Sequence, residues 1–344
     1  MSVHIRLRTS VAPSIMTLAL TAGLAGCGGG GTAGSADSAN SGVGVVNQYA
    51  QLARATIQSA DPASADSVVA AVAASDIIFN VSPVTPVAQR TGDLQCMGAF
   101  PQLRYLSTSI YGTAPSGESE LKYGWVNDPE AGAKAVTYMA IRKGDVDTAG
   151  TGNKRCEYAF SKSELVIPWD KDFWFTTAVR TGNMAGTTDQ QIVWQWHEQS
   201  GTSGLSPYLA AVVSGSSMFI QLRSNQNSSF GQANTTIYEV YRTTDWTPNT
   251  WNQFTVEAHL NTLDNGSSTV KIWLNGIQIV NRIGPVGYLY ANPVDYVKAG
   301  PYHWTGSGNP WSAAIDKREV WLKGPAMVLD RAGYTPEIVN ALIN

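Results

Sequence analysis

The chain has 344 residues, 14% of them charged, and a formal net charge of −3 at neutral pH. A weakly charged and mildly acidic chain lacks the overall positive charge of nucleic-acid-binding proteins, so nucleic acid is not an expected partner. A polyanionic ligand would require a local cluster of basic side chains.

The first residues predict a targeting signal. Arg6 and Arg8 precede an apolar stretch at 11–24 that is too short, and too rich in Gly, Ala and Thr, for a membrane-spanning helix. Leu-Ala-Gly-Cys at 24–27 resembles a bacterial lipobox, in which cleavage precedes the cysteine and the thiol is acylated. Residues 1–26 are then a lipoprotein signal peptide, and the mature charge becomes 21 − 26 = −5.

The residues after the cleavage site predict a membrane-anchored domain. Lipidated Cys27 is followed by Gly28 rather than aspartate, which favours the outer membrane, with the domain facing the periplasm or the cell surface. Residues 27–75 read as a flexible Gly/Ser-rich tether with a possible short helix, which either packs on the domain or forms a stalk. Residues 76–344 read as one domain.

This domain alternates short apolar runs with turn residues, which predicts an all-β fold. The runs are rich in aromatic and β-branched residues and are separated by Gly, Asn, Asp, Ser and Pro. We expect an antiparallel β-sandwich of the jelly-roll type with a concave substrate groove. The expected strands include 173–179, 191–197, 219–223, 254–260 and 270–274, and one C-terminal helix is expected at 335–343.

The segment 191–197 carries the first candidate site residues. Alternate side chains of a strand share a face. Ile192, Trp194 and Trp196 form an apolar side that we expect to face the core. Val193, Gln195 and His197 form the opposite side, where an amide and an imidazole are either an ordinary polar surface or part of a substrate cleft.

A second segment, 296–302, reads Tyr-Val-Lys-Ala-Gly-Pro-Tyr. Lys298 and Tyr302 share one face if no bulge intervenes. Together with Gln195 and His197, they would provide an ammonium, a phenol, an amide and an imidazole on one sheet surface. These groups suit the binding of an acidic sugar and the transfer of its protons.

The two segments resemble motifs of the alginate-lyase superfamily, Tyr-Phe-Lys-Ala-Gly-x-Tyr and Gln-(Ile/Val)-His. This superfamily includes heparin-lyase-like and glucuronan-lyase-like jelly rolls. A third family motif, Arg-(Ser/Thr)-Glu-Leu, has a weaker counterpart in Lys-Ser-Glu-Leu at 162–165. The resemblance spans roughly residues 90–330. Lys162 replaces the family arginine, and His303-Trp304 replaces the usual Asn-Gln, so the identity of the polymer stays open.

The resemblance implies β-elimination on a uronic-acid polymer such as alginate or glucuronan. Gln195, helped by a cation, would stabilise the sugar carboxylate while the C5 proton is removed. Tyr302 would donate a proton to the leaving oxygen, and His197 would act as a base or activate the phenol. Lys162, Glu164, Lys298, Arg223 and His303 are the expected substrate-binding residues.

Cys96 and Cys156 form either one disulfide or two buried thiols. No His/Cys cluster has zinc-ligand spacing, and Asp264-Asn265-Gly266 reads as a turn rather than a calcium site. We therefore expect no metal and no required cofactor, and a monomeric enzyme.

Two alternatives use the same fold. A non-catalytic carbohydrate-binding module or lectin would not need a tyrosine and a histidine that converge on one sugar. A glycoside hydrolase needs two carboxylates that flank the scissile bond. The nearest carboxylate pair on a short spacing, Glu118 and Glu120, lies in a Gly/Ser/Pro-rich loop and is a poor substitute.

Overall fold

The computed structural model describes residues 72–81, 93–96, 123–128, 135–145, 153–160, 167–184, 186–198, 206–225, 235–261, 265–288, 295–305 and 308–344. All of them belong to one compact unit, Val45–Asn344. The predicted signal peptide and most of the predicted tether, with Cys27, lie outside the described residues. Lys162 and Glu164 lie outside them as well.

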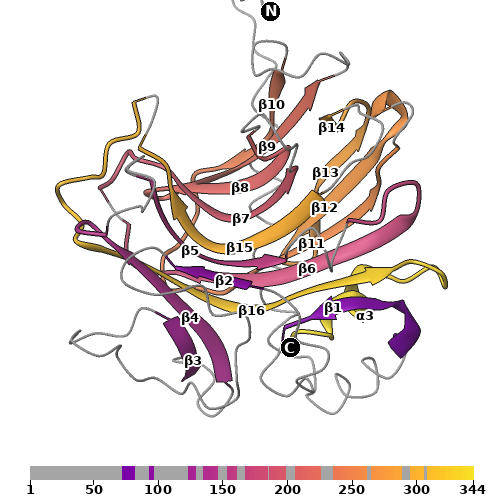
Figure 1. Ribbon diagram of the computed structural model, residues 1–344, viewed down its shortest axis with the longest axis horizontal. Helices are drawn as coiled ribbons and strands as arrows, with labels where there is room; N and C mark the ends of the chain where they lie inside the picture. Colours follow the sequence, from indigo (N-terminus) through magenta and orange to yellow (C-terminus); the bar gives the residue numbers. More distant parts are fainter. Residues whose placement is uncertain are drawn as a thin grey trace, which may run out of the picture. The chain divides into compact units, whose positions relative to one another are not determined.

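The described strands form two eight-stranded sheets, which we name sheet A and sheet B (Figure 1). Neighbouring strands are antiparallel except for β14 and β9, which run parallel. Sheet A has the order β13-β12-β11-β6-β16-β4-β3, with β1 also paired to β16. Its strands are β1 (Ile77–Asn80), β3 (Tyr123–Asn127), β4 (Ala135–Arg142), β6 (Asp172–Thr181), β11 (Asn252–His259), β12 (Thr269–Leu274), β13 (Ile277–Ile283) and β16 (Lys317–Leu329).

Sheet B has the order β10-β9-β8-β7-β15-β5-β2, with β14 beside β9. Its strands are β2 (Asp93–Cys96), β5 (Lys154–Phe160), β7 (Gln191–Glu198), β8 (Leu209–Ser214), β9 (Ser217–Asn225), β10 (Thr236–Thr243), β14 (Gly287–Tyr288) and β15 (Asp295–His303). All five strands expected from the sequence are present. The predicted all-β antiparallel jelly roll is confirmed.

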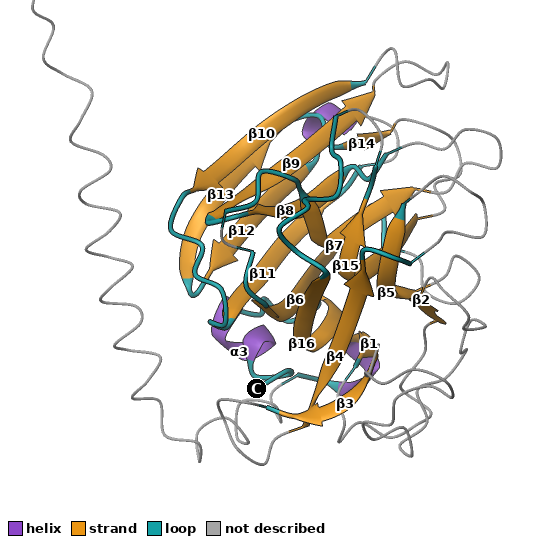
Figure 2. Ribbon diagram, turned by 90° about the vertical axis from the view of Figure 1, so that its left-hand side faces the viewer, coloured by secondary structure: helices purple, strands orange, loops and turns teal. Residues whose placement is uncertain are grey.

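Helices are few among the described residues: the short 3-10 turns η1 (Ala74–Asp76) and η4 (Asn265–Ser267), and the helix α3 (Pro336–Asn340). The Thr335 hydroxyl caps α3 by accepting a hydrogen bond from the Ile338 amide at 3.5 Å. Asn340 accepts hydrogen bonds from the hydroxyls of Thr176 and Thr255, which hold α3 on sheet A (Figure 2). The predicted C-terminal helix is confirmed. Within the described part of the chain, no helix combines the length and the hydropathy of a membrane span.

The two sheets pack through a core of aromatic side chains. Trp194 and Trp196 from β7 are fully buried. Their rings lie 5.5 Å from Phe175 and 5.4 Å from Phe173, both on β6 of sheet A. Large apolar side chains from both inner faces therefore interdigitate, as the alternation of residues 191–197 predicts for these two tryptophans.

The same strand departs from the predicted alternation at its start. Against β8 the register of β7 shifts between Ile192 and Trp194, which pair with the consecutive residues Val212 and Ala211, so β7 has one extra residue, the pattern of a β-bulge at Val193. Against β15 the shift lies between Ala299 and Tyr302, so in that ladder the extra residue is on β15. Val193 therefore packs in the main core, and Ile192 lies in a smaller cluster with Val212 and Phe219. The expectation that Ile192 faces the core and Val193 the opposite side is wrong, because the bulge exchanges the two faces.

A glycine allows β15 to lie unusually close to β5. Gly300 has φ +136°, and a Cβ at this position would lie 2.2 Å from the Cys156 carbonyl oxygen and 2.7 Å from the Met139 sulfur. No L side chain fits there without moving backbone atoms. The glycine between Lys298 and Tyr302 is therefore required by packing.

We predict that Gly300→Ala destabilises the domain by about 2 kcal/mol or more, because it combines backbone strain with a steric clash. Gly144→Ala is the matched control, since its Cβ would meet no atom within 4 Å. Thermal unfolding followed by circular dichroism measures both variants. Equal melting temperatures for the two variants would contradict the packing argument.

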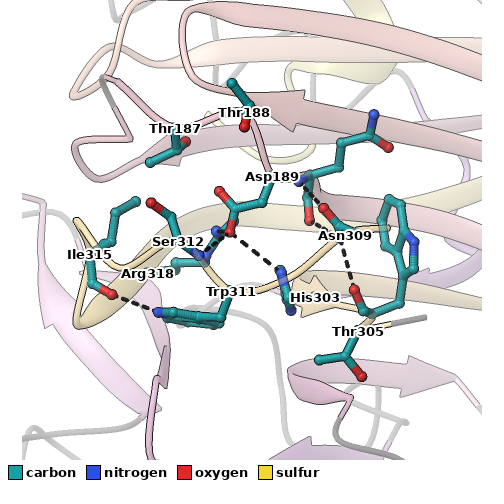
Figure 3. A network of polar contacts seen from close by, with 12 residues as sticks. Thr187, Thr188, Asp189, His303, Thr305, Asn309, Trp311, Ser312, Ile315 and Arg318 are labelled. Atoms are coloured by element: carbon teal, nitrogen blue, oxygen red, sulfur yellow. Dashed lines mark hydrogen bonds and ion pairs between the residues drawn. The ribbon is translucent and has the colours of Figure 1, made fainter. Parts of the chain in front are cut away.

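A buried polar cluster joins the two sheets at the end of β15 (Figure 3). The Asp189 carboxylate, just before β7, forms an ion pair with Arg318 of β16 and accepts a hydrogen bond from the Ser312 amide at 2.9 Å. His303 Nε2 lies 3.5 Å from the same carboxylate oxygen. His303 and Arg318 are almost completely buried. Because Arg318 belongs to sheet A and His303 to sheet B, we name this cluster the inter-sheet clamp.

Trp311 provides the ring against which the clamp packs. The Arg318 guanidinium lies 4.6 Å from its centroid, and the His303 ring contacts it edge-on at 5.1 Å. The ammonium of Lys154 lies 5.8 Å from the same ring. The charges of Arg318 and Lys154 thus act on His303, opposed by the close carboxylate of Asp189.

This environment keeps His303 neutral. Burial, and then the positive charges of Arg318 and Lys154, lower its pKa from 6.5 to about 4, although Asp189 opposes the shift. An unfolded chain takes up this proton near 6.5, whereas the folded protein takes it up only near 4. The stability associated with neutral His303 is therefore complete above pH 6.5 and is lost as the pH falls toward 4.

We predict that His303→Gln makes the free energy of unfolding less dependent on pH between 6.5 and 4, whatever its effect at neutral pH. Denaturant titrations at several pH values give the free energy of unfolding of the wild type and of the variant as a function of pH. The difference between the two slopes is the contribution of His303. A variant that loses stability as steeply as the wild type over this window would show that His303 is not the group responsible.

Candidate active site

Alternation and register bring seven polar side chains to the face of sheet B that is turned away from sheet A, which we name the outer face. They come from three adjacent strands. Opposite one another in the ladders lie Tyr296 and His197, Lys298 and Gln195, and Tyr302 and Arg155. The seventh is Glu157, two residues from Arg155 on β5.

Glu157 is the centre of this group. Its carboxylate is fully buried and accepts a hydrogen bond from the Gln195 side-chain amide at 2.6 Å. Arg155 Nη1 lies 3.9 Å from its other oxygen. Burial raises the pKa of Glu157, and the charges of Lys298 and Arg155 and the hydrogen bond from Gln195 oppose that rise.

The buried Lys298 is the charge that most strongly opposes the rise in the pKa of Glu157. It is 4% exposed, and its burial lowers its pKa from 10.5 to about 8, partly offset by the attraction of Glu157. Gln195 is only 1% exposed. Both residues are on the predicted face. Their side chains are almost completely buried and act on Glu157, and the substrate contacts expected of them stay a prediction.

Arg155 and Tyr302 lie closer to the surface. The guanidinium carbon of Arg155 is 4.4 Å from the centroid of the Tyr302 ring, and the Arg155 side chain is 20% exposed. Tyr302 is half-buried. A cation and a phenol are therefore held together above the buried carboxylate.

His197 does not lie across from Tyr302. Its ring stacks on Tyr296 at 5.0 Å with an interplanar angle of 16°. Six residues separate Tyr296 from Tyr302, roughly 20 Å of extended strand. His197 and Tyr302 lie on the same face of sheet B, as expected, but they are far apart along the paired strands. Lys298 lies between Tyr296 and Tyr302 on β15. Its ammonium is 5.1 Å from the centroid of the Tyr296 ring, and its charge also acts on Glu157.

Arg223 of β9 lies further along the outer face, at the level of His197. The Arg223 amide donates to the Tyr208 carbonyl, and the Tyr208 amide donates to the carbonyl of Trp196, next to His197. Its guanidinium donates a long hydrogen bond of 3.5 Å to Gln221. Burial lowers its pKa from the ordinary value. Arg223 thus shares a face with the candidate site, two strands away from His197.

The remaining expected residues in the described part of the chain are His303 and the two cysteines. His303 follows Tyr302 directly, so it points to the opposite side of β15, where it is completely buried in the inter-sheet clamp. That position does not fit the expected substrate contact. Cys156 is disulfide-bonded, and the backbone of Cys96 lies directly opposite it. The bond between these two cysteines stays a prediction that the register supports.

Two site residues, Arg155 and Glu157, escape the sequence analysis. They stand in Arg-Cys-Glu-Tyr at 155–158, which retains the arginine and the glutamate of the Arg-(Ser/Thr)-Glu-Leu motif. The segment 162–165 matches the motif at the serine, the glutamate and the leucine but lacks the arginine. A search that gave weight to the charged positions would find 155–158, which β5 places beside Tyr302.

Within the described ranges, no three side chains of His, Cys, Asp or Glu form a group that could hold a metal ion. The arrangement offers an exposed guanidinium, a phenol and an imidazole. These are groups that bind carboxylates and transfer protons.

Comparisons with known proteins agree with this chemistry. The family described as polysaccharide lyase matches residues 111–323, well over half of the chain. Among solved structures, the family 7 alginate lyase A1-II′ in complex with substrate has a TM-score of 0.50 at 13% identity, over 74% of this chain and 99% of that one. An alginate lyase from Pseudomonas aeruginosa has a TM-score of 0.45 at 16% identity, over 68% and 97% of the two chains.

An endo-β-1,4-glucuronan lyase from the fungus Trichoderma reesei has a TM-score of 0.46 at 12% identity, over 60% of this chain and 86% of that one. The comparison with curated protein sequences gave no match. The similarity to alginate lyase A1-II′ supports a shared jelly-roll fold, and the match over residues 111–323 establishes the family. The chain belongs to the polysaccharide lyase family and is a polysaccharide lyase.

Proposed function

We propose that this lyase cleaves a uronic-acid polymer, such as alginate, glucuronan or a related acidic glycan, by β-elimination. The single observation that carries the proposal is the contact of Arg155 with Tyr302 at 4.4 Å above the buried Glu157. It joins a carboxylate-binding cation to a proton donor on the outer face of sheet B.

Arg155 binds the carboxylate next to the scissile bond in this proposal. The C5 proton is weakly acidic because the adjacent carboxylate is already negative. A guanidinium can pair with a carboxylate through two parallel hydrogen bonds and stabilise the charge that develops on it. This assigns to Arg155 the role that the sequence analysis gives to Gln195 and Lys162.

Tyr302 supplies the proton. The bond between C5 and its hydrogen breaks, the electron pair forms the C4–C5 double bond, and the bond from C4 to the leaving oxygen breaks. The phenol of Tyr302 donates its proton to that oxygen. For the sugar configuration in which Tyr302 serves both steps, it begins as the phenolate, takes the C5 proton and then donates that proton to the leaving oxygen.

Gln195, Glu157 and Lys298 act as positioning residues. They are 1%, 0% and 4% exposed, so they act on the substrate through Arg155 and the strands that carry it. Arg223 is the proposed contact for a uronate further along the outer face. The reaction as written uses side chains only and requires no cofactor.

The cellular setting proposed here is that of a monomeric outer-membrane lipoprotein, anchored through Cys27, that faces the periplasm or the cell surface. Support comes from the lipobox-like residues 24–27 and the Gly/Ser-rich stretch after them.

We predict that the purified mature protein produces ultraviolet absorbance from a new carbon–carbon double bond when it is incubated with alginate or glucuronan. Tyr302→Phe should lower kcat by roughly 10²- to 10⁴-fold, because proton transfer contributes about that much to catalysis. Binding of the polymer should remain close to that of the wild type. Full activity in Tyr302→Phe would disprove the role of this phenol.

We also predict that Arg155→Gln lowers kcat/KM by roughly 10²- to 10³-fold, the range observed when one charge-stabilising donor is removed. Arg155→Lys should recover only part of the activity, because an ammonium does not reproduce the planar fork of arginine. Arg331→Lys is the control, since Arg331 is 62% exposed and pairs with Asp76 near sheet A. If Arg155→Gln and this control cleave equally well, Arg155 is not the carboxylate-binding group.

A further inference from the structure

Trp304 lies beside the proposed proton donor. It is half-buried, and its ring centroid is 6.4 Å from that of Tyr302. Both rings pack against an apolar cluster on the outer face, which consists of Ile192, Ala210, Val212 and Phe219. Tyr302 and Trp304 therefore form a continuous aromatic edge next to the reaction centre.

The backbone around Trp304 is held by two side chains from other segments, Asn309 and Asn153. Asn309 donates a hydrogen bond to the Trp304 carbonyl at 2.8 Å and binds both backbone groups of Gln190, at 2.6 Å and 3.0 Å. Asn153 accepts a hydrogen bond from the Thr305 amide at 3.0 Å. His303, on the other side, belongs to the inter-sheet clamp (Figure 3). Such anchoring limits the freedom that the indole would lose when a ligand binds.

The indole also keeps one polar group available. Its N–H donates to no described residue, whereas Trp174, Trp246, Trp251 and Trp311 all donate theirs within the fold. Tryptophan commonly has an apolar body and one hydrogen-bond donor at contact surfaces. A hexopyranose ring matches this chemistry, since it has an apolar C–H face and a rim of hydroxyl groups.

From this geometry we infer that Trp304 is the stacking platform for the sugar unit adjacent to the one that reacts at Tyr302. Two residues of strand separate them, roughly 7 Å, so one platform serves the neighbouring unit and not the reacting one. Trp304 then determines how tightly the chain is held, whereas Tyr302 performs the proton transfer. The location of the reacting unit rests on the proposed function, but the stacking itself requires only that the ligand is a polysaccharide.

The test uses tetrasaccharides of alginate and of glucuronan and measures binding separately from cleavage. Binding is measured in Tyr302→Phe protein, by isothermal titration calorimetry and by tryptophan fluorescence. In that background, Trp304→Leu should weaken tetrasaccharide binding roughly 10- to 100-fold, as expected for loss of a central aromatic contact. Trp304→Phe should bind the tetrasaccharide with an affinity between that of the Tyr302→Phe parent and that of Trp304→Leu, because it keeps an aromatic ring and loses the indole N–H.

In the otherwise wild-type enzyme, Trp304→Leu should raise KM by a similar factor and leave kcat within about threefold, a split that general destabilisation would not produce. Trp273→Phe, on sheet A, is the control and should retain the fluorescence response to the tetrasaccharide. The inference fails if Trp304→Leu binds like its parent, or if neither tetrasaccharide binds the parent. Binding that depends on Trp304, without cleavage by the wild-type enzyme, would support the platform and overturn the lyase mechanism.

Discussion

The buried carboxylate of Glu157 is the constraint on which the site depends. An ion without water is unstable by several kcal/mol unless charges and hydrogen-bond donors surround it. Here the donors come from three adjacent strands: Arg155 from β5 itself, Gln195 from β7 and the charge of Lys298 from β15. The carboxylate therefore favours one register of these strands, the register that also sets Tyr302 beside Arg155.

This constraint separates the residues that support the site from those that we propose to react. Gln195 and Lys298 carry the chemistry expected of substrate contacts, yet they are used to compensate Glu157. Arg155 interacts with Glu157 through one nitrogen, and its guanidinium carbon lies 4.4 Å from the centroid of the Tyr302 ring. A guanidinium oriented before the substrate arrives needs little reorganisation during the reaction, and such preorganised charge is usually the largest single contribution to catalysis.

The sequence predicts the fold well, because alternation and turn residues are local signals. The inward-facing Trp194 and Trp196 follow directly. Ile192 and Val193 do not, because a β-bulge leaves no clear mark in the residue pattern and reverses the faces before it.

The site is predicted less completely, for physical reasons. Alternation identifies which residues share a face, so Gln195, His197, Lys298 and Tyr302 are correctly placed together on one. It gives neither the ladder register, which pairs His197 with Tyr296, nor the depth of burial, which removes Lys298 and Gln195 from the surface. His303 shows the same limit. Its neighbour Tyr302 lies on the outer face, so strand geometry alone directs His303 inward, toward a cluster whose other members are distant in sequence.

The dipeptide His303-Trp304 couples the interior of the sandwich to the outer face of sheet B. Consecutive residues at the end of β15 point to opposite faces, so the histidine enters the inter-sheet clamp while the tryptophan joins the apolar cluster beside Tyr302. A change at either position alters both how firmly the strand end is held and what it presents to a ligand. The strand end that carries Trp304 is therefore held on its inner side by the buried His303 and beyond it by the hydrogen bond from Asn309 to the Trp304 carbonyl.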